Sequence, residues 1–317
     1  LALVSGFDSQ WQNVGKLRNK GIEVTLNTVN INKRNFSWTT DFNISFIRNE
    51  LLALADGADY LLARSGFNSN FSSYDYIAQV GSAIGSMYGY VFDGVYQASD
   101  FNVGPDGGLT LKPGVPDISA HAGQTVSPGF VKYKDLDGDG VITTDDRTII
   151  GNGQPDWYGG ITNSFKIYDF DLSFMLQYSV GGDVYNAQRM YSTQSRLEMQ
   201  NMLSEVADRW TATNASNKVP SAAGYVAYDV YSRFIEDGSF LRLKNITLGY
   251  TLPQTLTRKV HINNLRLYAT AQNLFCLTRY SGFDPEVNMR SSNLMPAFDF
   301  GAYPKAKIFT FGAEIKF

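Results

Sequence analysis

The chain has 317 residues, of which 44% are hydrophobic and 14% aromatic, with 21 Phe and 19 Tyr. Its net charge of −3, from 27 basic and 30 acidic residues, argues against a nucleic-acid partner, which requires a basic stripe. A single cysteine, Cys276, excludes an intrachain disulfide and a multi-cysteine metal site, and it is expected to be a small apolar residue at a strand end.

Hydropathy alone would class the chain as soluble. The mean value is −0.20, and no apolar run is long enough for a spanning helix. A β-barrel wall gives the same result, because lumen-facing polar residues alternate with the apolar ones. Residues 1–8 carry no secretory signal, so the chain is expected to be the C-terminal portion of a longer protein.

Alternation of apolar and polar residues recurs along the chain and predicts β-strands. It is clearest over 307–317, where Phe309, Phe311 and Ile315 share one face with the last residue, Phe317. An edge strand of a soluble sandwich would show one such segment, whereas a barrel needs many. Nine strands are expected, near 17–31, 36–48, 72–80, 86–97, 157–168, 170–181, 237–251, 264–276 and 306–317.

The connections between these strands alternate strictly between short and long. This is the asymmetry of periplasmic turns and extracellular loops in outer-membrane barrels, and counting back from Phe317 puts every short turn on the periplasmic side. Aromatic residues near the short turns would form the periplasmic girdle: Phe36, Trp38, Tyr168, Phe170 and Phe317. The short connections are 32–35, 81–85, 169 and 253–263, and the long ones are 49–71, 98–156, 182–236 and 277–305.

One acidic segment, in the expected extracellular loop 98–156, has the spacing of a calcium-binding loop. Asp135, Asp137 and Asp139 occupy positions 1, 3 and 5, and Gly140 at position 6 permits the sharp turn. Hard oxygen ligands at this spacing favour a structural Ca²⁺ over Mg²⁺ or zinc; the alternative is an acidic, solvated turn. The expected ligands are Asp135, Asp137, Asp139, the Val141 carbonyl, Thr143 and Asp146.

The expected extracellular loop 182–236 contains a helix signal. Ser195 and Glu198 form a capping box, and an apolar stripe follows that is expected to pack against neighbouring loops: Met199, Met202, Leu203, Val206 and Trp210.

Catalytic patterns are missing, so no enzyme is predicted. The two histidines, His121 and His261, are far apart in sequence with no acidic motif around either, and both are expected to be solvated. The glycines at 81–89 have neither dinucleotide nor phosphate-loop spacing.

Five segments resemble the SusC/RagA family of TonB-dependent outer-membrane transporters, in order and over nearly the whole chain. The run 238–245 (GSFLRLKN) is the most specific of them. The others are 13–23 (NVGKLRNKGIE), 133–140 (YKDLDGDG), 208–211 (DRWT) and 265–275 (LRLYATAQNLF), and the specific run extends to Pro253.

The resemblance implies the C-terminal part, about nine strands, of an antiparallel transmembrane β-barrel of about 22 strands. It further implies an N-terminal plug, TonB, a SusD-like surface lipoprotein that acts as a lid, and import of oligosaccharides or peptides. The plug, the TonB box and the earlier strands are absent from these residues, and a separate or unobserved barrel segment is expected to cover both sheet edges.

Two functions are therefore compatible with the sequence. The first is the wall of an outer-membrane transporter in contact with lipid and lipopolysaccharide; the second is a secreted, calcium-stabilised β-sheet protein that binds carbohydrate. Loop tyrosines could stack on sugars or peptides, or be buried against the lid: Tyr225, Tyr228 and Tyr231.

Overall fold

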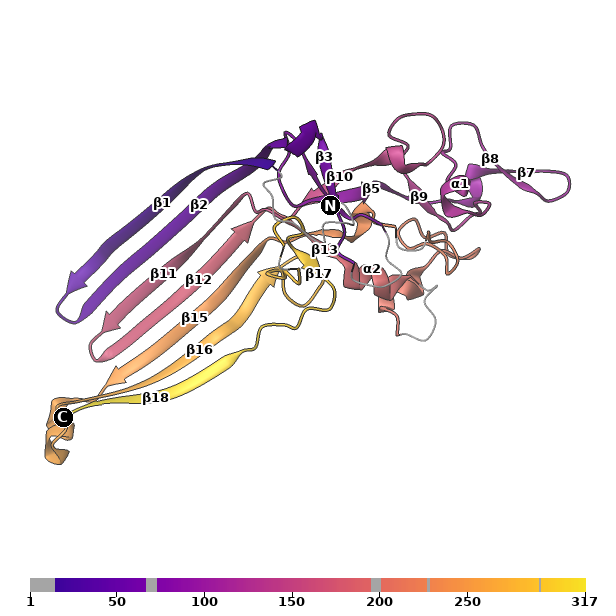
Figure 1. The fold of residues 1–317 in the computed structure, drawn as a ribbon. Coiled ribbons are helices and arrows are strands. Elements are labelled where there is room, and N and C mark those ends of the chain that lie inside the picture. Colours follow the sequence, from indigo (N-terminus) through magenta and orange to yellow (C-terminus); the bar gives the residue numbers. More distant parts are fainter. Residues whose placement is uncertain (1–14, 67–72, 195–200, 227–228, 291) are drawn as a thin grey trace, which may run out of the picture.

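A computed structural model describes residues 15–66, 73–194, 201–226, 229–290 and 292–317 (Figure 1). Its largest element is a seven-stranded antiparallel sheet in the order β1-β2-β11-β12-β15-β16-β18. The sheet is open, with β1 and β18 as its two edges. The seven strands are β1 (Gly15–Lys33), β2 (Phe36–Leu54), β11 (Trp157–Ile167), β12 (Phe170–Val180), β15 (Phe240–Thr251), β16 (Asn264–Thr278) and β18 (Ile308–Lys316).

The register of the ladders gives this sheet one apolar face and one polar face. Apolar residues are paired across the strands in the row Leu26, Phe42, Ile161, Leu176, Leu243 and Phe275. The neighbouring row on the other face is Asn27, Asp41, Thr162, Met175, Asn245 and Gln272. Because side chains alternate along each strand, the whole sheet keeps this division.

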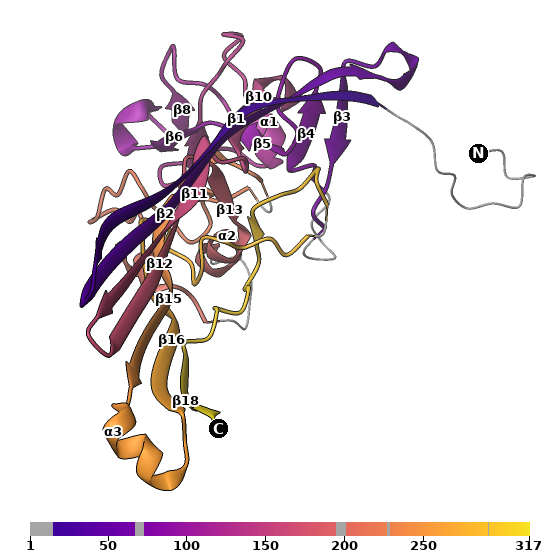
Figure 2. The ribbon, with the colours of Figure 1, turned by 90° about the vertical axis from the view of Figure 1, so that its left-hand side faces the viewer.

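Within the described residues, no second layer covers the apolar face. Ile22 is 66% exposed and Phe311 is 80% exposed, and Figure 2 shows the sheet as one curved layer. An exposed apolar face of this extent, opposite a polar face, is the arrangement of a membrane barrel wall, so the expected all-β fold class is confirmed.

All three hairpin turns of this sheet lie at one end, together with the C-terminus (Figure 1). The turns are 34–35, 168–169 and 252–263, and the last contains α3 (Gln254–Thr257) and η7 (Arg258–Val260). The three long connections, 55–156, 181–239 and 279–307, gather at the opposite end. The alternation of short and long connections is therefore present, and in outer-membrane barrels it is the long connections that are extracellular.

Two of the nine expected wall strands are not part of this sheet. Segment 72–80 contributes β4 (Tyr76–Gln79), and 86–97 contributes β5 (Ser86–Tyr90) and β6 (Phe92–Val95). These strands are too short to span a bilayer, and Tyr76, Ile77 and Ala78 are buried in succession, so neither face meets lipid. The turn 81–85 consequently lies at the loop end, contrary to the prediction. Loss of one strand pair leaves the direction of the remaining strands unchanged.

The long connections form a packed loop domain with four small sheets. Their strand orders are β10-β5-β4-β3, β14-β13-β17, β6-β9 and β7-β8. The further strands are β3 (Tyr60–Ala63), β7 (Phe101–Val103), β8 (Leu109–Leu111), β9 (Val131–Tyr133), β10 (Arg147–Asn152), β13 (Asp183–Asn186), β14 (Ile235–Asp237) and β17 (Phe298–Asp299). The helices are η2 (Ala55–Gly57), η3 (Ala98–Asp100), α1 (Ser119–Ala122), η4 (Thr144–Asp146), α2 (Ala187–Thr193), η5 (Ser204–Asp208) and η6 (Ser232–Phe234).

The main core of the molecule lies in this loop domain and is rich in tyrosine. Tyr90 stacks on Tyr133 with ring centroids 4.7 Å apart, and Tyr133 contacts Tyr231 at 5.3 Å. These rings come from two different long connections, so their packing joins the connections into one body. None of the helices in the described part of the chain is long and apolar enough to cross a membrane.

Candidate functional site

The polar face of the sheet holds a charge pair that joins two strands across the strand between them. Arg266 on β16 donates to both carboxylate oxygens of Asp171 on β12, at 2.9 and 2.5 Å. The pair crosses above Gly249 on β15, where a Cβ atom would lie only 2.4 Å from the Asp171 carboxylate. A larger residue at this position would therefore break the cross-strand bridge.

A second set of charges attaches the 279–307 connection to the sheet. Arg242 on β15 is 4% exposed, and its guanidinium lies 2.6 Å from Asp284 and 3.1 Å from Glu286. Glu286 also accepts from Lys305 and from Gln177 on β12. Arg242 belongs to the run 238–245, the most specific part of the resemblance. An arginine is needed at this position because it neutralises two carboxylates of the 279–307 connection.

Between the polar face and this connection lies a hollow of about 440 Å³. Amides, carboxylates and the aromatic rings of Tyr158, Tyr178 and Phe240 line it, a combination suited to sugars or peptides. Sequence reasoning missed this site, because its lining comes from several segments far apart in the chain. The polar residues of its lining include Gln154, Tyr158, Gln177, Asp183, Glu286, Asn288 and Asn293.

The loop tyrosines do not lie on an open binding surface. Tyr225 is 1% exposed and Tyr231 is 0% exposed, and Tyr231 belongs to the tyrosine-rich core. The expectation of stacking on sugars or peptides is therefore wrong for these two residues, because their rings pack within the loop domain. Tyr228 lies outside the described residues.

His121 is not solvated, contrary to the prediction. Its Nε2 lies 2.8 Å from Asp229 Oδ2, and Tyr133 donates to the same carboxylate oxygen at 3.1 Å. The hydrogen bond with Asp229 raises the pKa of His121 against the opposing effect of burial. The pair joins α1 to the segment before β14. His261 is exposed in the third turn, as expected, with a left-handed backbone of φ 61°.

The helix of the 182–236 connection begins before the predicted position. The capping box at 195–198 lies outside the described residues, and Leu203 and Trp210 are not in an α-helix. Instead α2 starts after Asn186, whose side chain caps it by accepting from the amide of Arg189 at 2.9 Å. Trp210 packs against Gly129 and donates to Gln97, in agreement with the expected packing against neighbouring loops.

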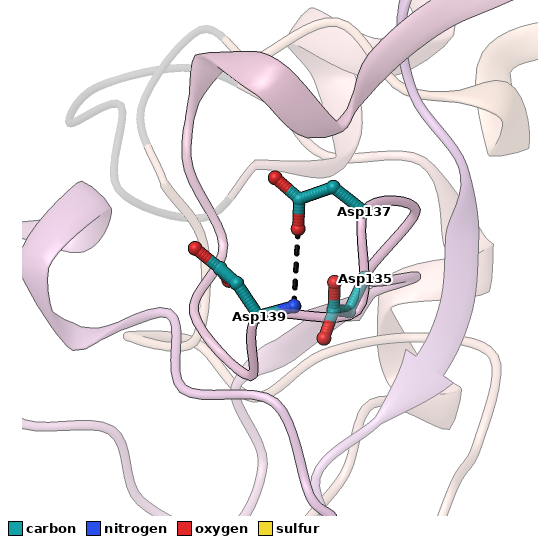
Figure 3. Close-up of side chains that lie close together, drawn as sticks. All are labelled: Asp135, Asp137 and Asp139. Carbon is teal, nitrogen blue, oxygen red and sulfur yellow. Dashed lines mark hydrogen bonds between the residues drawn. The ribbon is translucent and has the colours of Figure 1, made fainter.

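The acidic loop brings three of its expected ligands together. One carboxylate oxygen from each of Asp135, Asp137 and Asp139 lies within 4.8 Å of the others (Figure 3). Asp135 accepts from the amides of Gly138 at 2.7 Å and Gly140 at 2.8 Å. The Gly140 amide is the main cause that lowers the pKa of Asp135, so this side chain is a carboxylate at neutral pH.

The remaining expected ligands close the same loop. Asp146 is buried and accepts from the amides of Leu136 at 2.7 Å and Thr143 at 2.8 Å. Val141 donates its amide to Asp139, and Thr143 Oγ1 accepts from Asp145. Asp146 therefore holds the ends of the loop together, while the first three aspartates face one another.

An exposed apolar face, a polar face with buried charges and a packed loop domain at one end are the features of an outer-membrane β-barrel wall. Comparisons with known proteins agree. The chain is 38% identical over 318 residues to TonB-dependent receptor P3 of Formosa agariphila, covering 99% of this chain and 30% of that protein. It is 29% identical over 319 residues to TonB-dependent receptor SusC of Bacteroides thetaiotaomicron, covering 99% of this chain and 28% of SusC.

The fold has counterparts among solved structures. The RagAB peptide transporter matches with a TM-score of 0.70 and 23% identity, over 99% of this chain and 31% of the solved one. The RagAB peptide importer in its open-open state matches with a TM-score of 0.72 and 23% identity, over 100% and 30%. No family model matches the chain.

The predicted resemblance is confirmed: over 99% of its length the chain matches one segment of TonB-dependent receptors, SusC among them, and it has the fold of the matching part of RagAB. It spans about 30% of the length of the first curated relative. Its location is the bacterial outer membrane, as the sequence predicted.

Proposed function

We propose that the chain forms part of the wall of an outer-membrane importer for oligosaccharides or peptides. The observation that carries this proposal is the continuous polar face of the sheet, which ends in a hollow of about 440 Å³ beneath the 279–307 connection. A solute that moves along this face would meet amides and carboxylates rather than hydrocarbon. The names of the relatives, receptors and a peptide transporter, support transport rather than catalysis.

The alternative function, a secreted calcium-stabilised carbohydrate-binding protein, requires the apolar side chains to be covered by a second protein layer. The exposure of Ile22 and Phe311 favours the membrane wall instead.

The complete importer requires partners beyond this segment. Strands that complete the barrel would pair with β1 and β18, and a plug would fill the lumen. A SusD-like lipoprotein would cover the loop end, and TonB would supply energy through a part of the receptor other than this segment. The resemblance to SusC and RagAB supports this assembly.

The test is uptake by cells that lack the full receptor or carry variants of it. Loss of the receptor should abolish growth on the oligosaccharide or peptide that it imports. Tyr158→Ala in the hollow should raise the apparent KM for uptake severalfold, because the exposed ring would contact the solute. The matched control, Tyr168→Ala in the second turn, should leave uptake unchanged.

Uptake that survives deletion of the receptor, for every oligosaccharide and peptide tried, would contradict the importer. If deletion of the receptor abolishes uptake but Tyr158→Ala leaves the KM unchanged, only the role of the hollow is contradicted.

We further propose that residues 135–146 bind one structural Ca²⁺. The proximity of three carboxylates supports this, as do the turns at Gly138 and Gly140, whose φ values of 80° and 84° favour glycine. Ile142, within the loop, is fully buried in the tyrosine-rich core, so a cation here would stiffen the loop domain. The ligands would be Asp135, Asp137, Asp139, the Val141 carbonyl, Thr143 and Asp146.

Calcium titration of the full receptor tests this site. Asp139→Asn should weaken Ca²⁺ binding by at least about tenfold, since it removes one ligand charge from a hard-cation site. Asp145→Asn, an exposed neighbour outside the expected ligands, is the control and should bind as the wild type does. Equal affinity in both variants, or no binding by the wild type, would refute the calcium site.

A further inference from the structure

The hollow between the polar face and the 279–307 connection has an unbalanced set of charges. Its lining contains two carboxylates, Asp183 and Glu286, and no lysine, arginine or histidine in the described part of the chain. Its other polar side chains are uncharged, among them Gln154, Gln177 and Asn288. The charge that a solute meets here therefore depends on how far cations outside the lining neutralise the two carboxylates.

Glu286 is neutralised by its surroundings. Lys305 Nζ lies 2.5 Å from Glu286 Oε2, and the guanidinium of Arg242 lies 3.1 Å from the same oxygen. Arg242 also pairs with Asp284 at 2.6 Å. In this cluster two carboxylates meet two cations, so it adds no net charge to the hollow.

Asp183, by contrast, has no cation beside it. It lies at the start of β13, and its Oδ2 accepts from the amide of Asn152 at 2.9 Å. The charges that act on it are those of two further carboxylates: Asp237, directly opposite in the β13–β14 ladder, and Asp156. Burial raises the pKa of Asp183, and these two negative charges add to that effect. The carboxylate is thus held in surroundings that oppose its charge.

The two neighbouring carboxylates already have partners of their own. Asp156 pairs with Arg48 at 2.6 Å. Hydrogen bonds from Ser239 lower the pKa of Asp237, and the charge of Arg279 adds to this effect. Asp183 is therefore the carboxylate of the lining that lacks a counterion. A cation supplied by a solute would offset the cost of burying this charge.

We propose that this hollow selects solutes that carry an ammonium group and disfavours anionic ones. The inference rests on the proposed function, because it names the class of solute that the polar face would accept. The ammonium group would meet Asp183 Oδ1, since Oδ2 already accepts from Asn152. The uncharged part of the solute would lie against the amides and the ring of Tyr158. An anion would meet an uncompensated carboxylate instead.

The experiment measures solute retained by the full receptor, purified in detergent, after free solute has been removed. The first mixture contains equal amounts of three peptides with blocked termini, which differ only in a central Lys, Gln or Glu. The wild type should retain the Lys peptide about fivefold more than the Gln peptide, the effect of one ion pair in a water-exposed site, and the Glu peptide least. A second mixture, of glucosamine oligomers with and without N-acetyl groups, tests an amino sugar as the source of the ammonium group.

Three variants complete the design. Asp183→Asn removes the charge but can still accept from the amide of Asn152, and it should abolish the preference. Asn288→Lys adds a cation at an exposed position of the lining and should lower or reverse the preference. Asp169→Asn, in the exposed second turn at the other end of the sheet, is the matched control and should behave as the wild type does. Heat-modified mobility on gels verifies that each variant is folded.

A preference for the ammonium form in either mixture, lost in Asp183→Asn, supports the inference and identifies the source. Equal or absent retention of charged and neutral solutes by the wild type would overturn it, and so would a preference that persists in Asp183→Asn. Binding rather than import is measured, so this failure is distinct from uptake that survives deletion of the receptor, which would contradict the proposed function.

Discussion

At the scale of single residues, Asp75 is a buried carboxyl group that opposes folding at neutral pH. It is fully buried between β3 and β4, its Oδ1 accepts from the Ser65 amide at 2.7 Å, and its Oδ2 has no hydrogen-bond partner among the described residues. Burial raises its pKa from 3.8 to about 6. The folded state thus favours the protonated acid, and stability falls as pH rises from about 4 through 6.

Asp75→Asn should therefore stabilise the loop domain at pH 7.5 and have little effect below pH 4. The expected gain is on the order of 3 kcal/mol, because each unit between the two pKa values is worth about 1.4 kcal/mol. Hydrogen exchange of β4 and β5 in the full receptor measures it. A gain of the same size at pH 4 would show that the carboxylate charge is not the cause.

His121 should make the loop domain sensitive to pH in the same direction. The charged groups facing it are Asp229 and, more distantly, Arg147, with the rings of Tyr90 and Tyr133 beside them. Because its pKa is raised above 6.5, the stabilisation is complete below about 6.5 and is lost as pH rises through the higher value.

Hydrogen exchange of α1, corrected for intrinsic rates, should show more protection at pH 6 than at pH 8 in the wild type. His121→Gln should abolish this difference, whereas His261→Gln, in the exposed turn, should preserve it. If the pH dependence of protection persists in His121→Gln, a group other than His121 causes it.

At the scale of elements, the anchoring of the 279–307 connection depends on Arg242. Removal of one member of a buried ion pair typically costs about 3–5 kcal/mol, since the other charge remains buried. Arg242→Met should therefore release this connection, which limited proteolysis of the full receptor would detect. Arg242→Met combined with Asp284→Asn should recover much of the protection, and Arg258→Met in the exposed turn should change nothing. Equal cleavage of the single and double variants would contradict this account.

The wall strands could be predicted because their information is local. The alternation of apolar and polar residues along Phe36–Leu54 or Ile308–Lys316 shows directly which side chains share a face. The same pattern could not separate a wall strand from Tyr76–Gln79, because periodicity does not report what covers a face. The four-residue length of that strand was the missing signal.

The candidate sites likewise differ in whether their residues are close in sequence or far apart. The acidic loop proposed to bind calcium is contiguous, so its spacing alone predicted that Asp135, Asp137 and Asp139 lie together. The contact of His121 with Asp229 spans 108 positions, and that of Arg242 with Asp284 spans 42. No periodicity within one segment encodes such pairs, and the hollow between the polar face and the 279–307 connection was missed for the same reason.

At the scale of the whole molecule, the two edges of the sheet determine how the chain can exist in a membrane. β1 pairs only with β2, and β18 only with β16, so each leaves a row of backbone amides and carbonyls unpaired in this sheet. Hydrocarbon offers these groups no hydrogen-bond partner, at a cost of several kcal/mol for each group. The sheet therefore needs further strands on both edges before it is stable in a bilayer.

The 317-residue chain by itself should accordingly fail to become protease-resistant in liposomes, whereas the full receptor should do so. Refolding the chain together with the remaining part of the receptor, as two separate fragments, should restore resistance, because the added strands cover both edges. A protease-resistant product from the chain alone, whether a monomer or a closed oligomer by mass, would mean that the edges pair with each other. In that event the residues from Gly15 to Lys316 would form a complete wall.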